Sequence, residues 1–242
     1  MTWKKRALLL VLVTVAVSLG PRAANAQLLL ADRSGAEHRV LVSVGWESTW
    51  NVRIGYAAAI SRAIPANIDV TWTTPIAVFD PTRGGRLEAG LNTLVGQTRG
   101  LAAATSLRSG VAWSSDPLGA RVSWTGAALI APGWYDDTWH LAAELGWRAA
   151  LVTFMRHSDV VRGLYGDRIG APAGEGANLP SVFGLTSQRF DLGLRGGWAR
   201  AKGVGIVARA GLDLSPQVQG IVGVAPIYPL PFYADLGGDY RW

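Results

Sequence analysis

The sequence predicts an all-β fold: a transmembrane antiparallel up-and-down β-barrel of about ten strands, preceded by a cleaved signal peptide. Three observations lead to this prediction. Apolar and polar residues alternate over most of the chain after residue 37, and successive strand side chains point to opposite faces of a sheet. The first 26 residues have the composition of an export signal. Only 17% of the 242 residues are charged and 49% are hydrophobic, whereas a soluble domain carries about 25% charged residues.

The cysteine and charge content exclude several classes of function. The chain has no Cys, which excludes a disulfide scaffold, Cys-based metal ligation, a thiol nucleophile and a Cys-linked lipid anchor. The formal net charge is +6, but Lys4, Lys5, Arg6 and Arg22 lie in the first 26 residues, where there is no acid. The rest of the chain carries 19 basic and 17 acidic residues. We therefore expect no nucleic-acid partner.

The N-terminus has the three parts of a secretory signal peptide. Residues 1–6 are positively charged, residues 7–19 are apolar, and Ala24 and Ala26 supply small residues before a cut between Ala26 and Gln27. An apolar run of this length is too short for a membrane helix, which needs about 20 residues. We expect residues 1–26 to be removed and residues 27–37 to form a short periplasmic segment before the barrel of residues 38–242.

Ten segments show the alternation, and each is expected to form a strand with one apolar face. They are residues 38–46, 51–60, 67–78, 87–97, 100–114, 119–131, 138–155, 187–199, 203–214 and 231–242. In chain order, the apolar faces carry Val40, Val42 and Val44; Val52, Ile54 and Tyr56; Ile68, Val70 and Trp72; Leu87 and Leu91; Leu107, Val111 and Trp113; Val122 and Trp124; Trp139, Leu141 and Leu145; Phe190, Leu192 and Leu194; Ile206 and Leu212; Phe232 and Leu236.

The connections divide into short turns and long loops. Residues 97–100 and 199–203 form short turns at one end, while residues 156–186 form a long outer loop suited to recognition of a ligand or partner. Residues 217–231 are expected to form an extended hairpin tip or loop, because their prolines cannot donate to a ladder. Eight strands would require two segments to be misassigned, and twelve would require another strand within 156–186.

The last strand ends on an aromatic residue, in the sequence Tyr240-Arg241-Trp242. Here the chain resembles the Gram-negative outer-membrane β-barrel proteins, in the broad sense the small OmpA/OmpX-like class, without matching a named subfamily. The resemblance implies that the barrel assembly machinery reads Tyr240 and Trp242. It also implies an outer-membrane location among lipid and lipopolysaccharide, with both chain ends in the periplasm and an even strand number. Aromatic residues near strand ends, such as Trp46 and Trp139, favour this barrel over a soluble sandwich.

The polar faces of the strands predict a charged lumen. Eight basic and seven acidic residues fall on these faces, a near balance that predicts pairing across neighbouring strands. They are Arg53, Arg108, Arg121, Arg148, Arg189, Arg195, Arg209 and Arg241, with Asp69, Glu88, Glu144, Asp191, Asp213, Asp235 and Asp239. Side chains just fill a barrel of eight strands, and open channels belong to barrels of 16 or more. The predicted lumen is therefore closed or narrow.

No convincing catalytic or cofactor site emerges from the sequence. The three histidines are His38, His140 and His157, and His157-Ser158-Asp159 begins the long outer loop. Adjacent residues of a loop point in different directions, and a catalytic triad is defined by geometry. His140 is expected to be a hydrogen-bonded interior residue beside Glu144. We predict no metal, no cofactor and no catalytic residue.

Three functions fit these features. The first is a structural or scaffold component of the cell envelope, with other envelope proteins as partners of an envelope-spanning complex. The second is a narrow, porin-like channel for small solutes. The third is a lipid-modifying enzyme or a protease of the outer membrane, for which the sequence offers the weakest basis.

Overall fold

A computed structural model describes residues 36–46, 50–61, 65–76, 84–116, 119–159, 181–185, 187–198, 200, 202–214 and 232–242. The expected signal peptide, the cleavage residues Ala24 and Ala26, and the expected loop 217–231 lie outside these residues. Among the described residues, no helix is long and apolar enough to cross a membrane.

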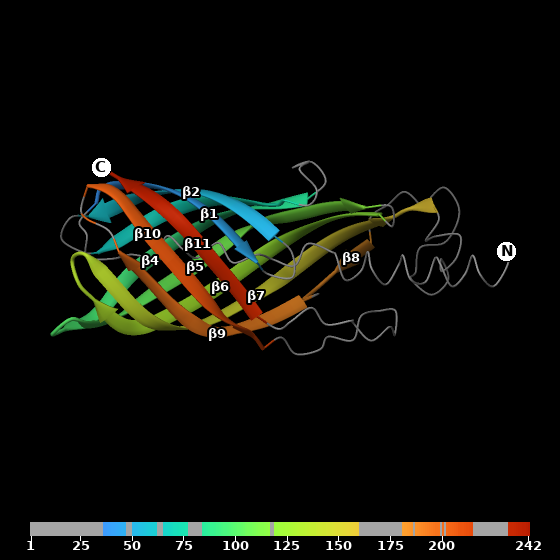
Figure 1. Cartoon of the computed structure of the whole chain (residues 1–242). Helices are drawn as coiled ribbons and strands as arrows, with labels where there is room; N and C mark the ends of the chain where they lie inside the picture. The colour runs from blue at the N-terminus through green and yellow to red at the C-terminus, as the bar shows by residue number, and fades with distance from the viewer. Residues whose placement is uncertain are drawn as a thin grey trace.

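The described residues form one antiparallel sheet of eleven strands (Figure 1). The strands are β1 (His38–Trp46), β2 (Trp50–Ser61), β3 (Ala66–Pro75), β4 (Gly84–Thr98), β5 (Leu101–Asp116), β6 (Gly119–Tyr135), β7 (Trp139–His157), β8 (Ser181–Phe183), β9 (Ser187–Trp198), β10 (Gly203–Asp213) and β11 (Phe232–Arg241).

The sheet closes into a barrel of ten strands. Each strand of the wall pairs with its neighbours in the chain, β1 pairs with β11, and the β6–β7 pairing completes the circle. Among the described residues, each strand of the wall is therefore paired on both sides, so the wall has no open edge. The predicted fold class, an up-and-down barrel of ten strands, is confirmed.

The short strand β8 continues the line of β9 and adds no strand to the wall. The last β7–β9 pair is Ala150↔Ser187, and the β7–β8 pairs begin at Thr153↔Phe183, further along the same edge of β7. Strand pairing therefore reaches into both ends of the expected long loop at 156–186. β7 continues to His157, and residues 181–183 pair with it because they extend the edge that β9 already occupies.

The expected ends of β4 and β6 differ from the structure by three and four residues. β4 begins at Gly84, because backbone pairing with β5 continues through Gly84↔Ser114 although the alternation fades. β6 was expected to end at residue 131, before Pro132, yet it continues to Tyr135. The β6–β7 ladder passes over Pro132 and resumes at Gly133↔Ala142, so the ladder does not require the N–H that proline lacks.

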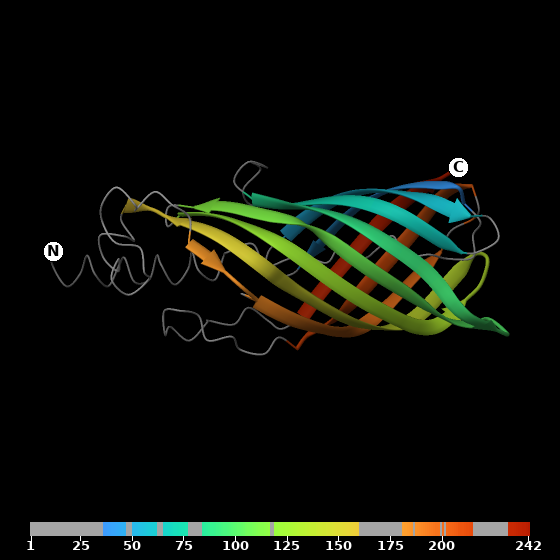
Figure 2. The ribbon, with the colours of Figure 1, turned by 180° about the vertical axis from the view of Figure 1, so that it is seen from behind.

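Both ends of the barrel sequence meet at one end of the molecule, which we call the terminal end. His38 and Trp242 exchange two backbone hydrogen bonds, of 3.1 and 3.2 Å between N and O. The β4–β5 turn lies at this end and consists of Arg99 and Gly100, both with positive φ, as a two-residue hairpin turn requires. At the opposite end, β4 to β7 extend beyond the shorter strands β1 and β3 (Figure 2).

The strands are staggered around the barrel. A path around the wall can be traced by stepping from each residue to its backbone partner on the next strand. The path that starts at Trp139 on β7 and passes Trp198 on β9 returns to β7 at Val152, not at Trp139. This stagger tilts the strands to the axis, by about 35–45° in closed barrels.

The outer face of the barrel is apolar. Leu107, Leu194 and Leu236 are each more than 60% exposed, and Val, Ile and Leu occupy most other outward positions. Apolar patches of this extent are rare on soluble monomers, whereas lipid-facing barrels require them. The outside of this barrel is therefore suited to lipid.

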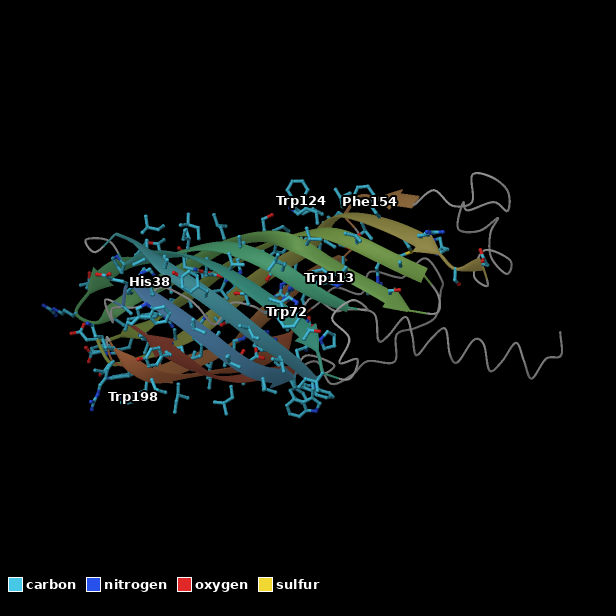
Figure 3. All side chains as sticks on the ribbon, turned by 90° about the horizontal axis from the view of Figure 1, so that it is seen from above. His38, Trp72, Trp113, Trp124, Phe154 and Trp198 are labelled. Atoms are coloured by element: carbon cyan, nitrogen blue, oxygen red, sulfur yellow. The ribbon has the colours of Figure 1, made fainter. Side chains whose placement is uncertain are left out.

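Aromatic side chains gather towards both ends of the outer face. His38 and Trp198 lie near the terminal end, while Trp72, Trp113 and Trp124 lie towards the opposite end (Figure 3). At the terminal end, Trp134 and Trp139 stack with ring centroids 6.3 Å apart, as do His38 and Trp242 at 5.6 Å. Membrane barrels carry such girdles at their two interfaces, on either side of an apolar band about 25 Å tall.

Candidate functional site

The inner face of the barrel holds all fifteen charged residues expected there. Thirteen are buried, and Arg121 and Asp213 are half-buried. Arg121 donates to the hydroxyl of Ser114 at 2.6 Å. Two further buried arginines, Arg39 and Arg86, also face inward. Sequence reasoning missed them because each precedes the first apolar residue used to define its strand, although their alternation with Val40 and Leu87 could have revealed them.

The largest ionic network, which we call the central cluster, joins Arg53, Asp235, Arg209, Glu144 and Arg195. Asp235 pairs with Arg53 on β2 and, at 2.7 Å, with Arg209 on β10. Glu144 on β7 accepts from Arg209 at 2.9 Å and from Arg195 on β9 at 3.3 Å. Three guanidinium groups thus share two carboxylates over five strands, and all five side chains are buried.

Tyr233 packs onto this cluster from β11. Its hydroxyl donates to Glu144 at 3.3 Å, and the guanidinium of Arg209 lies 4.8 Å from its ring centroid, within cation–π range. The hydroxyl lies over Gly193 and Gly211, where a Cβ atom would overlap it. Glycine at these two positions gives the ring space beside Glu144.

A second network, the β3–β5 cluster, is built around Asp69 on β3. Arg108 on β5 binds Asp69 with both nitrogen ends and also donates to Thr71 at 3.1 Å. This pair crosses the intervening strand β4 at Gly90, where a Cβ atom would lie 2.8 Å from the Asp69 carboxylate. Asn92 donates to Asp69 at 2.5 Å. A buried carboxylate needs several such donors to offset its lost hydration.

Glu88 connects two arginines beside the β3–β5 cluster. Its carboxylate lies 3.4 Å from Nε of Arg86 and 3.9 Å from Nε of Arg108. All three side chains are buried.

Two smaller clusters lie towards the two ends of the lumen. Towards the opposite end, Arg189 pairs with Asp191 at 2.8 Å and with Asp213 at 3.1 Å, and Arg148 lies 3.9 Å from Asp191. Arg189 and Asp191 lie two positions apart on β9, and the other two pairs join β9 to its neighbours β10 and β7.

At the terminal end, Asp239 is shared by Arg39 at 3.0 Å and by Arg241 at 2.7 Å. This terminal-end cluster therefore holds two arginines on one carboxylate.

One part of the inner face is apolar. Four alanines, two leucines and a tyrosine of β4–β7 form a buried cluster, which we call the apolar wall. Its members are Leu94, Ala102, Ala104, Leu129, Ala131, Tyr135 and Ala142. Register places them on the lumen side, since Leu94 pairs with Ala104 and Ala104 with Ala131, in line with Glu144. In the sequence, these Ala and Leu residues occupy the inward-facing positions of the alternation. Only the charged residues at such positions had been considered as lumen residues.

Two of the three histidines contact aromatic side chains. His38 bonds Tyr56 at 2.8 Å between Nδ1 and the hydroxyl, and His140 stacks on Tyr135 with ring centroids 5.5 Å apart. His157 ends β7. Among the residues that the structure describes, no three His, Asp or Glu side chains gather as a metal ion would require.

The two residues of the expected assembly signal lie outside the lumen. Tyr240 and Trp242 are exposed on the outer face, with ring centroids 5.9 Å apart. Most of the loop 156–186 lies outside the described residues.

No family model matches the chain, and no curated protein matches its sequence. Two solved structures show a weak overall likeness. One is a KdgM porin, with a TM-score of 0.35 and 4% identity, covering 84% of this chain and 99% of that chain. The other is BamA from Haemophilus ducreyi lacking POTRA domains 1–3, with a TM-score of 0.34 and 13% identity over 76% of this chain. The present chain covers 35% of that BamA chain. Likeness at this level assigns neither a family nor an activity.

Proposed function

We propose that this protein is an integral outer-membrane β-barrel with a closed or narrow lumen, acting as a structural or scaffold component of the cell envelope. In the broad sense it would be a small barrel of the OmpA/OmpX-like class. Its partners would be outer-membrane lipid and lipopolysaccharide, the barrel assembly machinery and other envelope proteins. The observation that carries the proposal is the central cluster, buried inside a cylinder whose outside is apolar.

The central cluster supports a lumen that resists opening. Widening the lumen there would separate Glu144 or Asp235 from its arginines. Breaking a buried ion pair costs about 3–5 kcal/mol when it leaves one charge unpaired. Each carboxylate is held by two arginines, so movement of one side chain does not release it.

The test is conductance of the refolded protein in planar lipid bilayers. A closed barrel should give no stable conductance steps. As a matched comparison, Glu144→Ala removes the acceptor shared by Arg195 and Arg209. This change should produce open events that the unaltered protein lacks. Stable conductance of the unaltered protein would contradict a closed lumen.

A second candidate is a narrow channel that prefers anions. Ten arginines and seven acids face the lumen among the described residues, and a ring of Arg favours anions in a pore. If the unaltered protein conducts, the reversal potential in a salt gradient should then show anion preference. Cation preference or no preference would count against this second candidate. The enzyme alternative has no supporting arrangement among the described residues.

A further inference from the structure

The inner face of β1–β4 carries buried polar atoms that have no hydrogen-bond partner among the described residues. Three of them are Oγ of Ser43, Oγ1 of Thr73 and Oε1 of Glu88, from residues that are 2%, 3% and 2% exposed. A buried polar atom without a partner costs free energy, so such atoms in folded proteins almost always bind protein, water or an ion. These three atoms therefore call for a polar occupant.

Backbone register groups the three atoms with two arginines. Ser43 on β1 is the partner of Arg53 on β2, which in turn is the partner of Thr73 on β3. Thr73 is also the partner of Arg86 on β4, and Glu88 follows Arg86 by two positions on the same face. Opposite side chains on neighbouring strands lie about 4.5–5.5 Å apart at Cβ. We call these five residues the β1–β4 group, in which hydroxyl and guanidinium side chains alternate beside one carboxylate.

Positive charge surrounds the carboxylate of this group. Four guanidinium groups act electrostatically on Glu88, those of Arg86, Arg108, Arg148 and Arg53. Two of them are also held by other carboxylates, Arg53 by Asp235 and Arg108 by Asp69. Over the whole lumen, the described residues still carry ten arginines against seven acids. A buried charge needs opposite charge and hydrogen bonds to offset its lost hydration, so an anion suits the β1–β4 group better than water does.

Space for an ion is present beside Arg86. Gly84 precedes it by two positions on the inner face of β4. A Cβ atom added at Gly84 would meet no atom nearer than 3.9 Å, apart from those of its chain neighbours. The inner face next to the guanidinium is therefore not filled by side chains.

We propose that the β1–β4 group binds one inorganic phosphate ion. In this site, the guanidinium groups of Arg53 and Arg86 and the hydroxyl groups of Ser43 and Thr73 donate to the phosphate oxygens. Oε1 of Glu88 accepts the proton that one phosphate oxygen carries. The inference goes beyond the proposed function, because a closed lumen and a narrow channel can both hold such an ion.

The carboxylate of Glu88 distinguishes phosphate from sulfate. Near neutral pH, phosphate retains at least one proton, whereas sulfate retains none. A protonated phosphate oxygen can donate to Oε1, but a sulfate oxygen beside the same buried carboxylate is only repelled. The site should therefore prefer phosphate although both ions are tetrahedral and negatively charged.

Equilibrium dialysis with radiolabelled inorganic phosphate tests the site directly. The chain is refolded in detergent micelles at each phosphate concentration, so that a closed lumen cannot exclude the ion. Binding should saturate at one phosphate per chain, and unlabelled sulfate should compete at least tenfold less well than unlabelled phosphate. Absence of saturable binding, or equal competition by sulfate, would overturn the proposal.

Thr73→Val removes one donor and keeps the shape of the side chain. Loss of a hydrogen bond to a charged group should weaken phosphate binding about tenfold. Thr153→Val is the matched control, because Thr153 also faces inward but its hydroxyl bonds that of Ser123 at 2.8 Å. Phosphate binding of the control should stay unchanged. Unaltered binding in Thr73→Val, or an equal loss in both variants, would count against the site.

Glu88→Gln tests the discrimination between the two ions. This change replaces the repelling carboxylate by a neutral amide, so the preference for phosphate over sulfate should fall at least tenfold. A variant that still rejects sulfate would contradict the role given to Glu88 and with it the proposal. If this variant does not refold, sulfate competition in the unaltered chain and phosphate binding by Thr73→Val decide the outcome.

Conductance separates this inference from the proposed function. A chain that stays closed in bilayers but binds phosphate on refolding supports both. A closed chain without phosphate binding removes the phosphate site and leaves the closed lumen. A chain that conducts removes the closed lumen, and phosphate should then reduce its chloride current in the unaltered protein more than in Thr73→Val. Equal reduction in the two proteins would overturn the phosphate site.

Discussion

Glu144 is the residue on which most of the central cluster depends. It accepts from Arg195, Arg209 and Tyr233, and its side chain is fully buried. Glu144→Gln would leave two buried guanidinium groups without this charge. We expect a loss of about 3–5 kcal/mol in the free energy of unfolding, the cost of breaking a buried pair.

A urea titration of protein refolded into lipid vesicles measures this loss. Asp137→Asn, at an exposed turn position, is the matched control and should leave the midpoint unchanged. Equal midpoints for both variants would contradict the role given to Glu144.

Gly193 tests the space that Tyr233 occupies. A Cβ atom there would overlap the Tyr233 hydroxyl and lie 2.5 Å from the backbone oxygen of Ala210, which cannot move without distorting β10. Gly193→Ala should therefore destabilise the barrel by about 1–3 kcal/mol, as overpacking does. Gly184→Ala, where the added Cβ meets nothing within 4 Å, should have little effect. Thermal unfolding of the two variants, followed by circular dichroism, provides the comparison.

The sequence predicted which residues face the lumen but not which ones pair. The alternation around Ile54 placed Arg53 inward, and the same rule placed Asp235 inward. Their contact depends on β1 lying between β2 and β11. Gly45 on β1 is the partner of Asp235 and leaves room for the pair, because a Cβ atom there would be 2.9 Å from Arg53. That register is a property of the closed barrel, in which residues 182 positions apart become neighbours.

At the scale of the element, β9 separates the two faces most clearly. Leu194 is 61% exposed on the outside, while Arg195 next to it is buried inside. Leu194→Arg should cost about 2–4 kcal/mol, the penalty for Arg on a lipid face near the membrane midplane. Leu194→Ala removes a similar apolar contact without adding charge and should cost less. Urea titration in vesicles measures both, and equal costs would place Leu194 away from lipid.

The last strand, β11, carries the expected assembly signal. Trp242 directly follows the strand and lies on the outer face beside Tyr240. If the assembly machinery reads this terminal aromatic, deletion of Trp242 should reduce membrane-inserted protein several-fold in cells. Trp134→Ala is the control, because Trp134 belongs to the girdle at the same end without being terminal. Equal reduction in both variants would indicate a general girdle effect. Quantifying the protein in isolated membranes measures the difference.

Element boundaries show where sequence reasoning reaches its limit. The period-two pattern located all ten wall strands, because lipid outside and charge inside demand strict alternation. It missed β8, since three residues are too few to show a period. It also ended β6 at residue 131, four residues early, because the β6–β7 ladder resumes beyond Pro132 at Gly133↔Ala142 and a gap in a ladder is not visible in the sequence.

At the scale of the whole molecule, closure predicts resistance to detergent. Every wall strand is paired on both sides, so sodium dodecyl sulfate meets no open edge at which to begin unfolding. Unheated samples should therefore migrate differently from heated ones on a gel. The native protein should also fractionate with outer membranes. Recovery as a soluble periplasmic protein would contradict the membrane location.

Pairing between β1 and β11 has a consequence for how the chain folds. Its partners, from Arg39↔Arg241 to Trp46↔Ala234, are 202 to 188 residues apart. This seam therefore has the highest contact order in the barrel and should close late. Two ion pairs, Arg39–Asp239 and Arg53–Asp235, lie on the inner side of the seam. A slip of one residue would turn both aspartates towards lipid. The two ion pairs therefore favour the correct β1–β11 register over a slipped one when the barrel closes, and a slipped seam should separate again more readily than a correct one.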